Sequence, residues 1–250
     1  MKTFAIPRST SQIEQISLMN RIMSGLARHW LLVINVLLGI WVVLPWLAPV
    51  MMNWGWTGIG KAIYLIYSFQ CHQLPERSYF LFGKQFMYSL SEIQAAWQTT
   101  NDPMILRQFI GNTEMGWKVA WSDRMVSMYT SIVIGGLVYG LFRKKTKPLA
   151  FWIFALLILP MVIDGGTHML SDLAGVGQGF RDTNIWLQTI TNNVFSMSFY
   201  QGDALGSFNS WMRLITGVLF GLGLVAFSFP YINESFADVV HNNQRKGDFK

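Results

Sequence analysis

Long runs of apolar residues alternate with polar segments along this chain, and the lengths of the runs predict its fold. Four runs, residues 30–52, 125–142, 149–170 and 211–231, each contain at most one Asp, Glu, Lys or Arg. A helix rises ~1.5 Å per residue and the hydrocarbon core of a bilayer is ~30 Å thick, so about 20 residues are needed to cross it. The pattern therefore predicts an all-α, polytopic membrane helical bundle with four to five transmembrane helices.

Two further segments have apolar residues at helical spacing but are harder to place. Residues 56–70 are too few for an ordinary span. They fit a short fifth span, a re-entrant half-helix or an interfacial helix, and the interpretation that we favour embeds them in the membrane. Residues 12–28 carry a broad apolar stripe and predict an amphipathic helix on the membrane surface. We therefore expect an amphipathic segment 1–28, a transmembrane domain 29–232 and a polar C-terminal tail 233–250.

The polar segments between the spans, residues 73–123 and 171–208, are expected to form helical insertions. Residues 89–110 look helical, with Ser89 or Ser91 as the N-cap, Glu92 in the first turn and a break at Asn101-Asp102-Pro103. The chain has one cysteine, which excludes an intrachain disulfide. These insertions must therefore be held by packing and hydrogen bonds.

The composition supports a membrane protein and the charges orient it. Hydrophobic residues make up 52% of the 250 and charged residues only 13%. The connector Arg143-Lys144-Lys145-Thr146-Lys147 has four basic residues close to two membrane ends, so we expect it to be cytoplasmic. The C-terminus would share that side, and segments 73–123 and 171–208 would be extracytoplasmic. The expected location is a bacterial or archaeal cell membrane.

The remaining basic residues leave the N-terminus undecided and give no sign of a nucleic-acid partner. Lys2, Arg8, Arg21 and Arg28 against Glu14 favour a cytoplasmic N-terminus, which requires that residues 56–70 do not span. If those residues do span, the N-terminus lies outside. Basic residues at membrane boundaries are explained by attraction to the anionic lipid bilayer.

Polar and ionisable residues collect toward the extracytoplasmic side. The octapeptide Cys71-His72-Gln73-Leu74-Pro75-Glu76-Arg77-Ser78 ends one apolar segment, and Asp123 and Arg124 precede the second long run. Asp164 and His168 are four residues apart on one helical face, with Asp164 about 22 Å from the start of its run. Arg213 opens the last run. Ionisable groups within a membrane segment are costly and are usually functional or paired.

Two interpretations of this layer compete. In the first, Cys71, His72, Asp164 and His168 bind zinc or another transition metal in a membrane enzyme that acts on a lipid-like or exported substrate. Asp164, His168 or Glu76 would then be the catalytic acid or base, and the head group of the substrate would be held by Arg77, Arg124 and Arg213.

In the second interpretation the layer is structural. Asp164 is neutralised by Arg124 or Arg213, and Cys71 is a small buried side chain. The chain would then be a non-catalytic accessory subunit of a complex with other membrane proteins. Neither the Cys71–His72 spacing nor the Asp164–His168 spacing is a recognised metal signature. A transporter is disfavoured, because no inverted repeat is visible.

Three blocks of the sequence resemble a known family. The run IYSFQCHQLPERSYFLFG, residues 66–83, is similar to the CHQ-x-P-x-R-S signature of a bacterial and archaeal family of membrane proteins of unknown function. The blocks LPMVIDGGTH, residues 159–168, and NSWMRLITG, residues 209–217, resemble two further motifs of that family. The resemblance covers about residues 56–225 and implies a helical membrane protein, but no activity.

The chain departs from this pattern at one place. Many family members carry a pair of cysteines before the span that begins here at residues 120–124, AWSDR, where only the arginine is kept. If those cysteines bind metal in the relatives, their replacement argues against a metal here, although Asp123 offers an oxygen ligand. Insertions around residues 86–118 and 171–206 enlarge the exported part and would give a docking surface for a partner.

Overall fold

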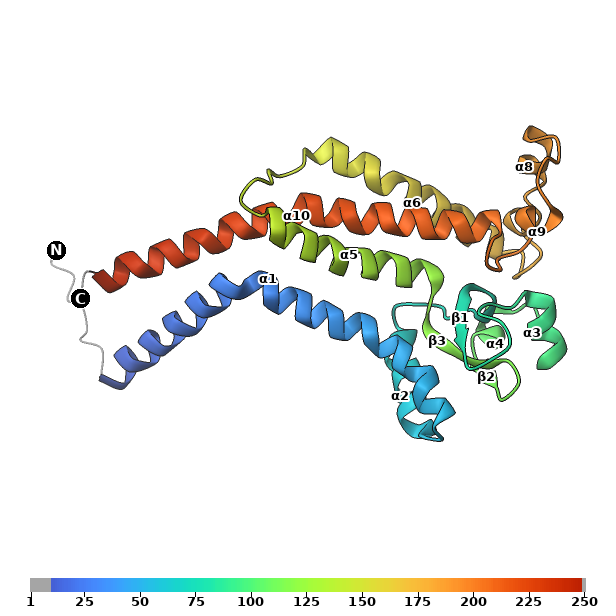
Figure 1. Ribbon diagram of the computed structural model, residues 1–250, viewed down its shortest axis with the longest axis horizontal. Helices are drawn as coiled ribbons and strands as arrows, with labels where there is room; N and C mark the ends of the chain where they lie inside the picture. The colour runs from blue at the N-terminus through green and yellow to red at the C-terminus, as the bar shows by residue number, and fades with distance from the viewer. Residues whose placement is uncertain (1–9, 249–250) are drawn as a thin grey trace, which may run out of the picture.

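Four long helices form the body of the protein. A computed structural model describes residues 10–248 of the chain, with side chains described for 18, 19 and 21–243. The long helices are α1 (Thr10–Asn53), α5 (Asp123–Phe142), α6 (Phe151–Asp172) and α10 (Phe208–Asp248) (Figure 1). Each contains a stretch long and apolar enough to cross a membrane, in α1 from Arg21 and in α10 to Asn243. The prediction of an all-α membrane bundle is confirmed.

Small residues let α5 and α10 approach closely. Gly217 and Gly221 of α10 lie against Ser127 and Ser131 of α5, and a Cβ added at Gly221 would lie 2.0 Å from the Ser131 Oγ. Such small residues four positions apart are typical of close helix pairs in membranes. α1 joins the pair through Trp30, whose ring packs in an aromatic cluster with Tyr139, Phe229 and Phe236.

The bundle has two different ends. The start of α1, the end of α10 and the α5–α6 connection, residues 143–150, lie toward one end, which we call the loop end (Figure 1). The other end, called the head end, carries residues 54–122 and 173–207. With both described ends of the chain at the loop end, the spans must be even in number.

The short helix α2 (Thr57–Ser68) does not add a fifth span to the four long helices. Its 12 residues extend ~18 Å, which is too short to cross. It turns back along α1, where Gly60 lies against Met52 and the Tyr67 hydroxyl donates to the Trp41 carbonyl at 2.7 Å. The structure therefore has four candidate spans, and the alternative of a fifth span over residues 56–70 is wrong because the helix is too short.

Both terminal helices extend beyond the inner bundle. α1 is kinked at His29 (φ −109°, ψ 16°), at the predicted border of the amphipathic segment, and α10 continues without interruption to Asp248. The Asn243 side chain donates to the Ser24 hydroxyl at 3.1 Å, which joins the two extensions. Residues 233–248 are thus helical. Residues 1–9 of the predicted amphipathic segment and residues 249–250 of the predicted tail lie outside the described residues.

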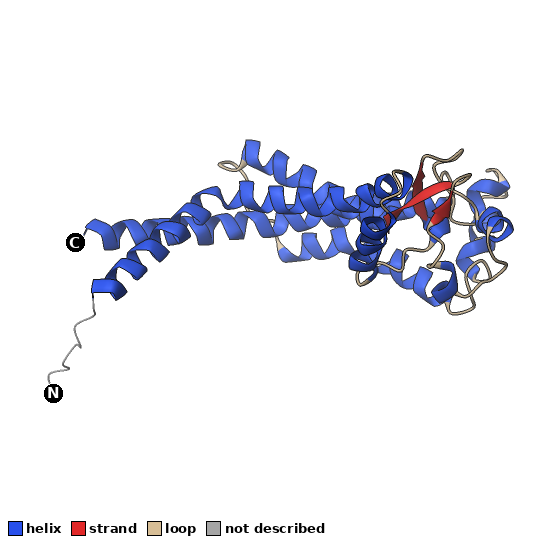
Figure 2. Ribbon diagram, turned by 90° about the horizontal axis from the view of Figure 1, so that it is seen from below, coloured by secondary structure: helices blue, strands red, loops and turns tan. Residues whose placement is uncertain are grey.

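The first head segment contains a small sheet that the sequence analysis did not predict. Strands β1 (Ser78–Leu81), β2 (Gly111–Asn112) and β3 (Gly116–Ser122) form an antiparallel sheet in the order β1-β3-β2 (Figure 2). The expectation of purely helical insertions was therefore wrong here. β3 has four consecutive buried residues, so it lacks the alternating pattern of a surface strand.

Short helices complete the head. The helical prediction for residues 89–110 is confirmed in part, as α3 (Leu90–Ala96) and α4 (Pro103–Leu106) separated by the predicted break. Ser89 is the N-cap of α3 in a capping box with Glu92. The 3₁₀ helix η1 (Pro75–Arg77) precedes β1. The second head segment consists of α7 (Phe180–Thr183), α8 (Ile185–Ile190) and α9 (Met197–Tyr200).

Candidate functional site

The Cys71–Gln73 part of the octapeptide fastens α2 to the sheet. The Cys71 sulfur accepts hydrogen bonds from the backbone N–H groups of Gln73 at 3.3 Å and Ser122 at 3.4 Å. The buried Gln73 side-chain amide donates to the carbonyls of Tyr64 and Ala120. The Gln73 amide therefore satisfies one backbone acceptor on α2 and one on β3. These contacts give Cys71 and Gln73 structural roles at the turn from α2 into the head.

The second half of the octapeptide begins a network of ion pairs where the head meets the spans. This head-end network consists of four arginines and four aspartates: Arg77, Arg124, Arg181, Arg213, Asp123, Asp164, Asp172 and Asp203. Seven of the eight side chains are at most 16% exposed, and that of Asp172 is 21% exposed. Equal numbers of opposite charges offset the cost of burying them.

One half of the network joins η1 to α10 and α5. The Arg77 guanidinium donates to both carboxylate oxygens of Asp172 at 2.7 Å and, through Nε, to Asp203 at 2.7 Å. Asp203 also accepts from Arg213, whose Nε donates to Asp123 at 2.8 and 2.9 Å. Burial alone would raise the pKa of the Asp203 carboxyl, but Arg77 and Arg213 hold it well below its usual range.

The other half is centred on Asp164 of α6. Its two carboxylate oxygens accept from Arg124 of α5 and from Arg181 of α7, each at 2.7 Å. Arg181 also donates to Asn209 at 3.2 Å and lies 3.2 Å from the His168 Nε2. Because Asp123 and Arg124 are neighbours in α5, the two halves are connected through one turn of helix. The network therefore links the head to three of the four spans.

Glu76 and Lys118 are buried beside the network, but neither is hydrogen-bonded to an oppositely charged side chain among the described residues. Both carboxylate oxygens of Glu76 lack a hydrogen-bond partner among the described residues, and the nearest cation is Arg77 Nε at 3.8 Å. Burial raises the pKa of the Glu76 carboxyl to about 7. The Lys118 amine donates to the carbonyls of Gln73 and Arg107 at 2.7 Å, and burial lowers its pKa to about 7. Neutral forms of both groups are thus accessible at physiological pH.

The structure does not assemble the predicted metal ligands. His72 is exposed, and the contacts of Cys71 are with Ser122 and Gln73 rather than with α6. Only Asp164 and His168 lie together, 3.9 Å apart, and Asp164 already accepts from two arginines. In the described part of the chain no group of three or more His, Cys, Asp and Glu residues is placed to hold a metal ion. The donor geometry therefore does not fit zinc at these four positions.

The predicted substrate-binding arginines are all engaged by aspartates of the chain. Arg124 pairs with Asp164, as one form of the structural interpretation expected, while Arg213 pairs with Asp123 and Asp203. The network residues Asp172, Arg181 and Asp203 were not among the residues predicted from the sequence. A signal was present, because Arg181, Asp182 and Asp203 are the charged residues of 173–207, an otherwise uncharged segment.

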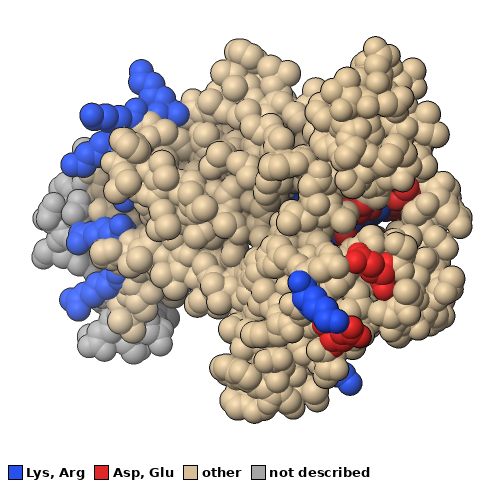
Figure 3. All heavy atoms as spheres, turned by 45° about the vertical axis from the view of Figure 1, so that its right-hand side comes forward, with Lys and Arg blue, Asp and Glu red and all other residues tan. Residues whose placement is uncertain are grey.

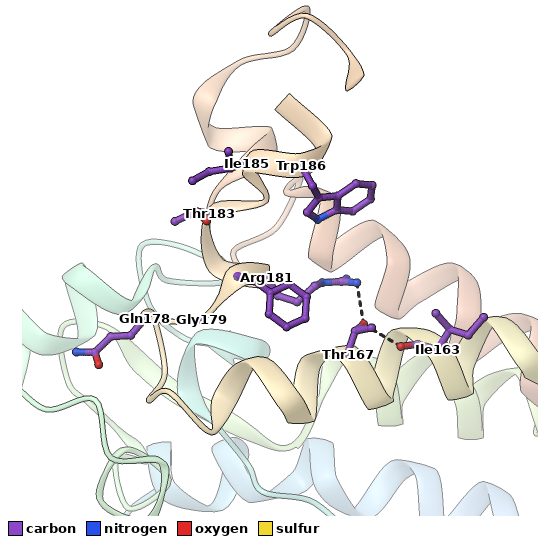
Figure 4. Close-up of a pocket in the computed structure, with 9 residues that line it drawn as sticks. Ile163, Thr167, Gln178, Gly179, Arg181, Thr183, Ile185 and Trp186 are labelled. Atoms are coloured by element: carbon purple, nitrogen blue, oxygen red, sulfur yellow. Dashed lines mark hydrogen bonds between the residues drawn. The ribbon is translucent and has the colours of Figure 1, made fainter. Parts of the chain in front are cut away.

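A cleft of about 750 Å³ opens beside the network, between the end of α6 and helices α7 and α8. Figure 4 shows Arg181 and Thr167 on one side of it and Ile185 and Trp186 on the other. The Arg181 Nη1 donates to the Thr167 hydroxyl at 3.1 Å. The walls are otherwise mainly apolar, so the cleft combines a small polar floor with a hydrophobic lining. This volume lies within the range of small-molecule sites.

Charges on the surface lie at the two ends of the molecule. In Figure 3 the Lys and Arg side chains project at one end, a broad middle zone has none of the four charged residue types, and acidic and basic atoms reappear at the other end. Some of these atoms lie within a hollow of the surface. This distribution is typical of a membrane protein, in which the uncharged zone faces lipid.

Comparisons with other proteins agree with this architecture. A family model described as "Predicted membrane protein (DUF2085)" matches residues 113–227, which contain α5, α6 and most of the membrane-crossing part of α10. An uncharacterized protein of the archaeon Methanocaldococcus jannaschii is 25% identical over 149 residues, which cover 58% of this chain and 69% of the archaeal protein. No solved structure matches. The family match begins after the octapeptide, so it leaves the motif itself untested, but the chain is similar to predicted membrane proteins over three spans.

Proposed function

We propose that the chain is a membrane protein that binds a lipid-like molecule in the cleft between α6, α7 and α8, with the head-end network as its rigid support. The observation that carries this proposal is the pairing of an apolar lining with a polar floor at Arg181 and Thr167. An acyl or prenyl chain would occupy the apolar part. An oxygen of its head group would accept from the remaining N–H of the Arg181 Nη1.

The head-end network fits a structural support for the cleft better than a catalytic site. Arg77, Arg124 and Arg213 are neutralised by aspartates, so they are not available to hold an anionic substrate without breaking buried pairs. Breaking a buried pair costs about 3–5 kcal/mol. Arg181 is likewise balanced by Asp164, which favours a ligand whose head group accepts hydrogen bonds over one that needs a full countercharge.

The test is to measure lipid that stays bound to the purified full-length protein. We expect native mass spectrometry from detergent to detect bound lipid on the unmodified chain and roughly tenfold less on Trp186→Ala, which removes a wall of the cleft. Trp152→Ala is the matched control, because Trp152 is 64% exposed at the opposite end of α6. Equal retention by both variants, or no lipid on the unmodified chain, would contradict the proposal.

A second candidate function is that of an accessory subunit in a membrane complex. The observation that favours it is an apolar stripe on α1 beyond the loop end of the bundle. The stripe consists of Leu18, Met19, Ile22, Met23 and Leu26, each at least 44% exposed. A photo-crosslinker at residue 22 in native membranes should then give a single defined adduct, whereas lipid adducts alone would count against a subunit role.

A further inference from the structure

The two head segments differ in the number of charged side chains that they expose. Residues 78–118 expose charged side chains at four positions, Lys84, Glu92, Asp102 and Glu114. Residues 173–207 contain three charged residues, Arg181, Asp182 and Asp203, and all three are buried at 4–8% exposure. The described surface of the second segment therefore carries no charge, whereas that of the first is typical of a protein in water.

The uncharged surface is also strongly apolar. Large hydrophobic side chains are exposed along its whole length, among them Leu173 at 80%, Ile190 at 73%, Val194 at 76% and Leu205 at 61%. A water-facing segment of this size would leave an apolar patch that soluble surfaces rarely carry. In Figure 3 the upper right lobe, where α8 and α9 lie, shows none of the four charged residue types.

This surface continues the membrane-facing side of α6. Val162 and Met169 are 60% and 65% exposed on that candidate span, and Leu173 follows directly at its end. Ile163, 56% exposed on the same helix, also lines the cleft together with Ile185 and Trp186 of α8. The apolar surface therefore passes from the span to α7 and α8, and the one charged side chain at the junction, Asp172, is 21% exposed and paired with Arg77.

We propose that residues 173–207 are embedded in the lipid leaflet at the head end, so that the cleft opens into the bilayer while the sheet-containing segment stands in water. Lipid is the occupant that fits, because the described surface of this segment exposes large apolar side chains and no charged one, and its exposed polar residues, such as Asn192, Asn193 and Gln201, are uncharged and suit the head-group region. It also extends a surface that already faces acyl chains. The buried Arg181 and Asp203 are paired within the network, with Asn184 and Asn209 donating to the Arg181 carbonyl, and the buried Asp182 accepts from the Gly179 N–H at 2.8 Å. This inference holds whether or not the cleft has a ligand.

The test measures the depth of single labels on the full-length protein in nanodiscs of phosphatidylcholine and phosphatidylglycerol. Cys71 is retained, since it is 7% exposed, and the unmodified chain serves as the unlabelled background. Spin labels are placed by Ile190→Cys and Val194→Cys, with Val162→Cys as the lipid reference and Glu114→Cys as the water reference. Collision rates with oxygen and with a water-soluble nickel chelate report the surroundings of each label.

Labels at 190 and 194 should resemble the label at 162, with an oxygen-to-nickel accessibility ratio at least several-fold above that at 114. The inference is overturned if both labels follow the water reference. It is also overturned if both are shielded from oxygen and nickel alike, because that result indicates a protein contact. The accessibility ratio does not depend on whether the cleft holds a lipid, which the Trp186→Ala variant tests. The cleft proposal and the embedding proposal can therefore fail separately.

Discussion

Asp164 shows how a single residue decides between two interpretations of the same sequence. A carboxylate in an apolar run suggests a catalytic or metal-binding group, and its i,i+4 histidine strengthens that suggestion. In the structure each carboxylate oxygen accepts from a different arginine, one on α5 and one on α7. Both carboxylate oxygens therefore have arginine partners within the chain, and the residue acts as a junction between the second head segment and the spans.

Asp164→Asn should destabilise the protein strongly, because it leaves two buried guanidinium groups without their carboxylate. We expect a loss of about 3–5 kcal/mol in the free energy of unfolding, measured by titration with sodium dodecyl sulfate and followed by the exposure of Cys71 to a thiol reagent. Glu114→Gln is the control, since it breaks a pair whose side chains are 75% and 72% exposed, and should cost under about 1 kcal/mol. An unchanged stability of Asp164→Asn with reduced lipid binding would favour the functional interpretation.

Glu76→Gln should change how stability depends on pH. The pKa of Glu76 is raised from 4.5 to about 7, so its contribution to stability is complete below pH 4.5 and is lost as the pH rises through 7. Relative to the unmodified chain, the variant should gain on the order of 3 kcal/mol between pH 4.5 and pH 8. Lys118, with its pKa lowered by burial, loses stability as the pH falls toward 7, and because the charge of Glu76 partly opposes that lowering, this contribution differs somewhat between the two proteins. A pH-independent difference between the two proteins would show that Glu76 is ionised throughout.

At the scale of elements, the packing of α5 on α10 depends on small residues. Gly217 and Gly221 present no side chain to α5, and the hydroxyl of Ser131 is bonded to its own helix through the Met128 carbonyl at 2.8 Å. The two backbones can therefore approach without leaving a polar group unpaired in lipid. The same helices position Asp123 and Arg213 for their ion pair.

Gly221→Ala should separate α5 from α10. The added Cβ would lie 2.5 Å from the Met128 carbonyl oxygen, which is backbone and can move only with its helix. We expect a loss of about 1–3 kcal/mol in the free energy of unfolding, as for other overpacked cores. Gly166→Ala on α6 is the matched control, because nothing lies within 4 Å of its Cβ position, and it should leave stability unchanged or raised by up to about 1 kcal/mol. Equal effects of both substitutions would contradict close packing at Gly221.

The helices were predictable because hydrophobic length alone defines them, whereas the site depended on contacts distant in sequence. The four apolar runs and the cap at Ser89 follow from local rules. Arg77 lies 126 residues from its partner Asp203, and no local pattern connects them. β3 was missed because it is buried on both faces, which removes the alternation that marks a strand. The metal interpretation failed to fit the geometry because neighbouring Cys71 and His72 point to different surroundings, one buried and one exposed.

At the scale of the whole molecule, the four spans place the start of α1 and the end of α10 on the side of residues 143–150. The basic residues of that connection favour the cytoplasm, and the sheet-containing segment would then face outward. This orientation stays a prediction, whereas the relative placement of the two ends follows from the fold (Figure 1).

Single cysteines at Lys145 and Glu114 test the orientation, since both side chains are exposed. A membrane-impermeant maleimide should label Glu114→Cys in intact cells and Lys145→Cys only after the membrane is opened, because a charged reagent does not cross the hydrocarbon core. The unmodified chain, whose one cysteine is buried, provides the background. Labelling of Lys145→Cys first would reverse the orientation.

The neighbouring positions of Asp123 and Arg124 at the first turn of α5 have a mechanical consequence. One side chain is held by α10 and the other by α6, so any rotation of α5 about its axis strains both attachments at once. The helix can neither rotate about its axis nor tilt independently of its neighbours, and a displacement of α6 or of α10 is transmitted to the other. Melting of the assembly should accordingly occur in a single cooperative step rather than helix by helix.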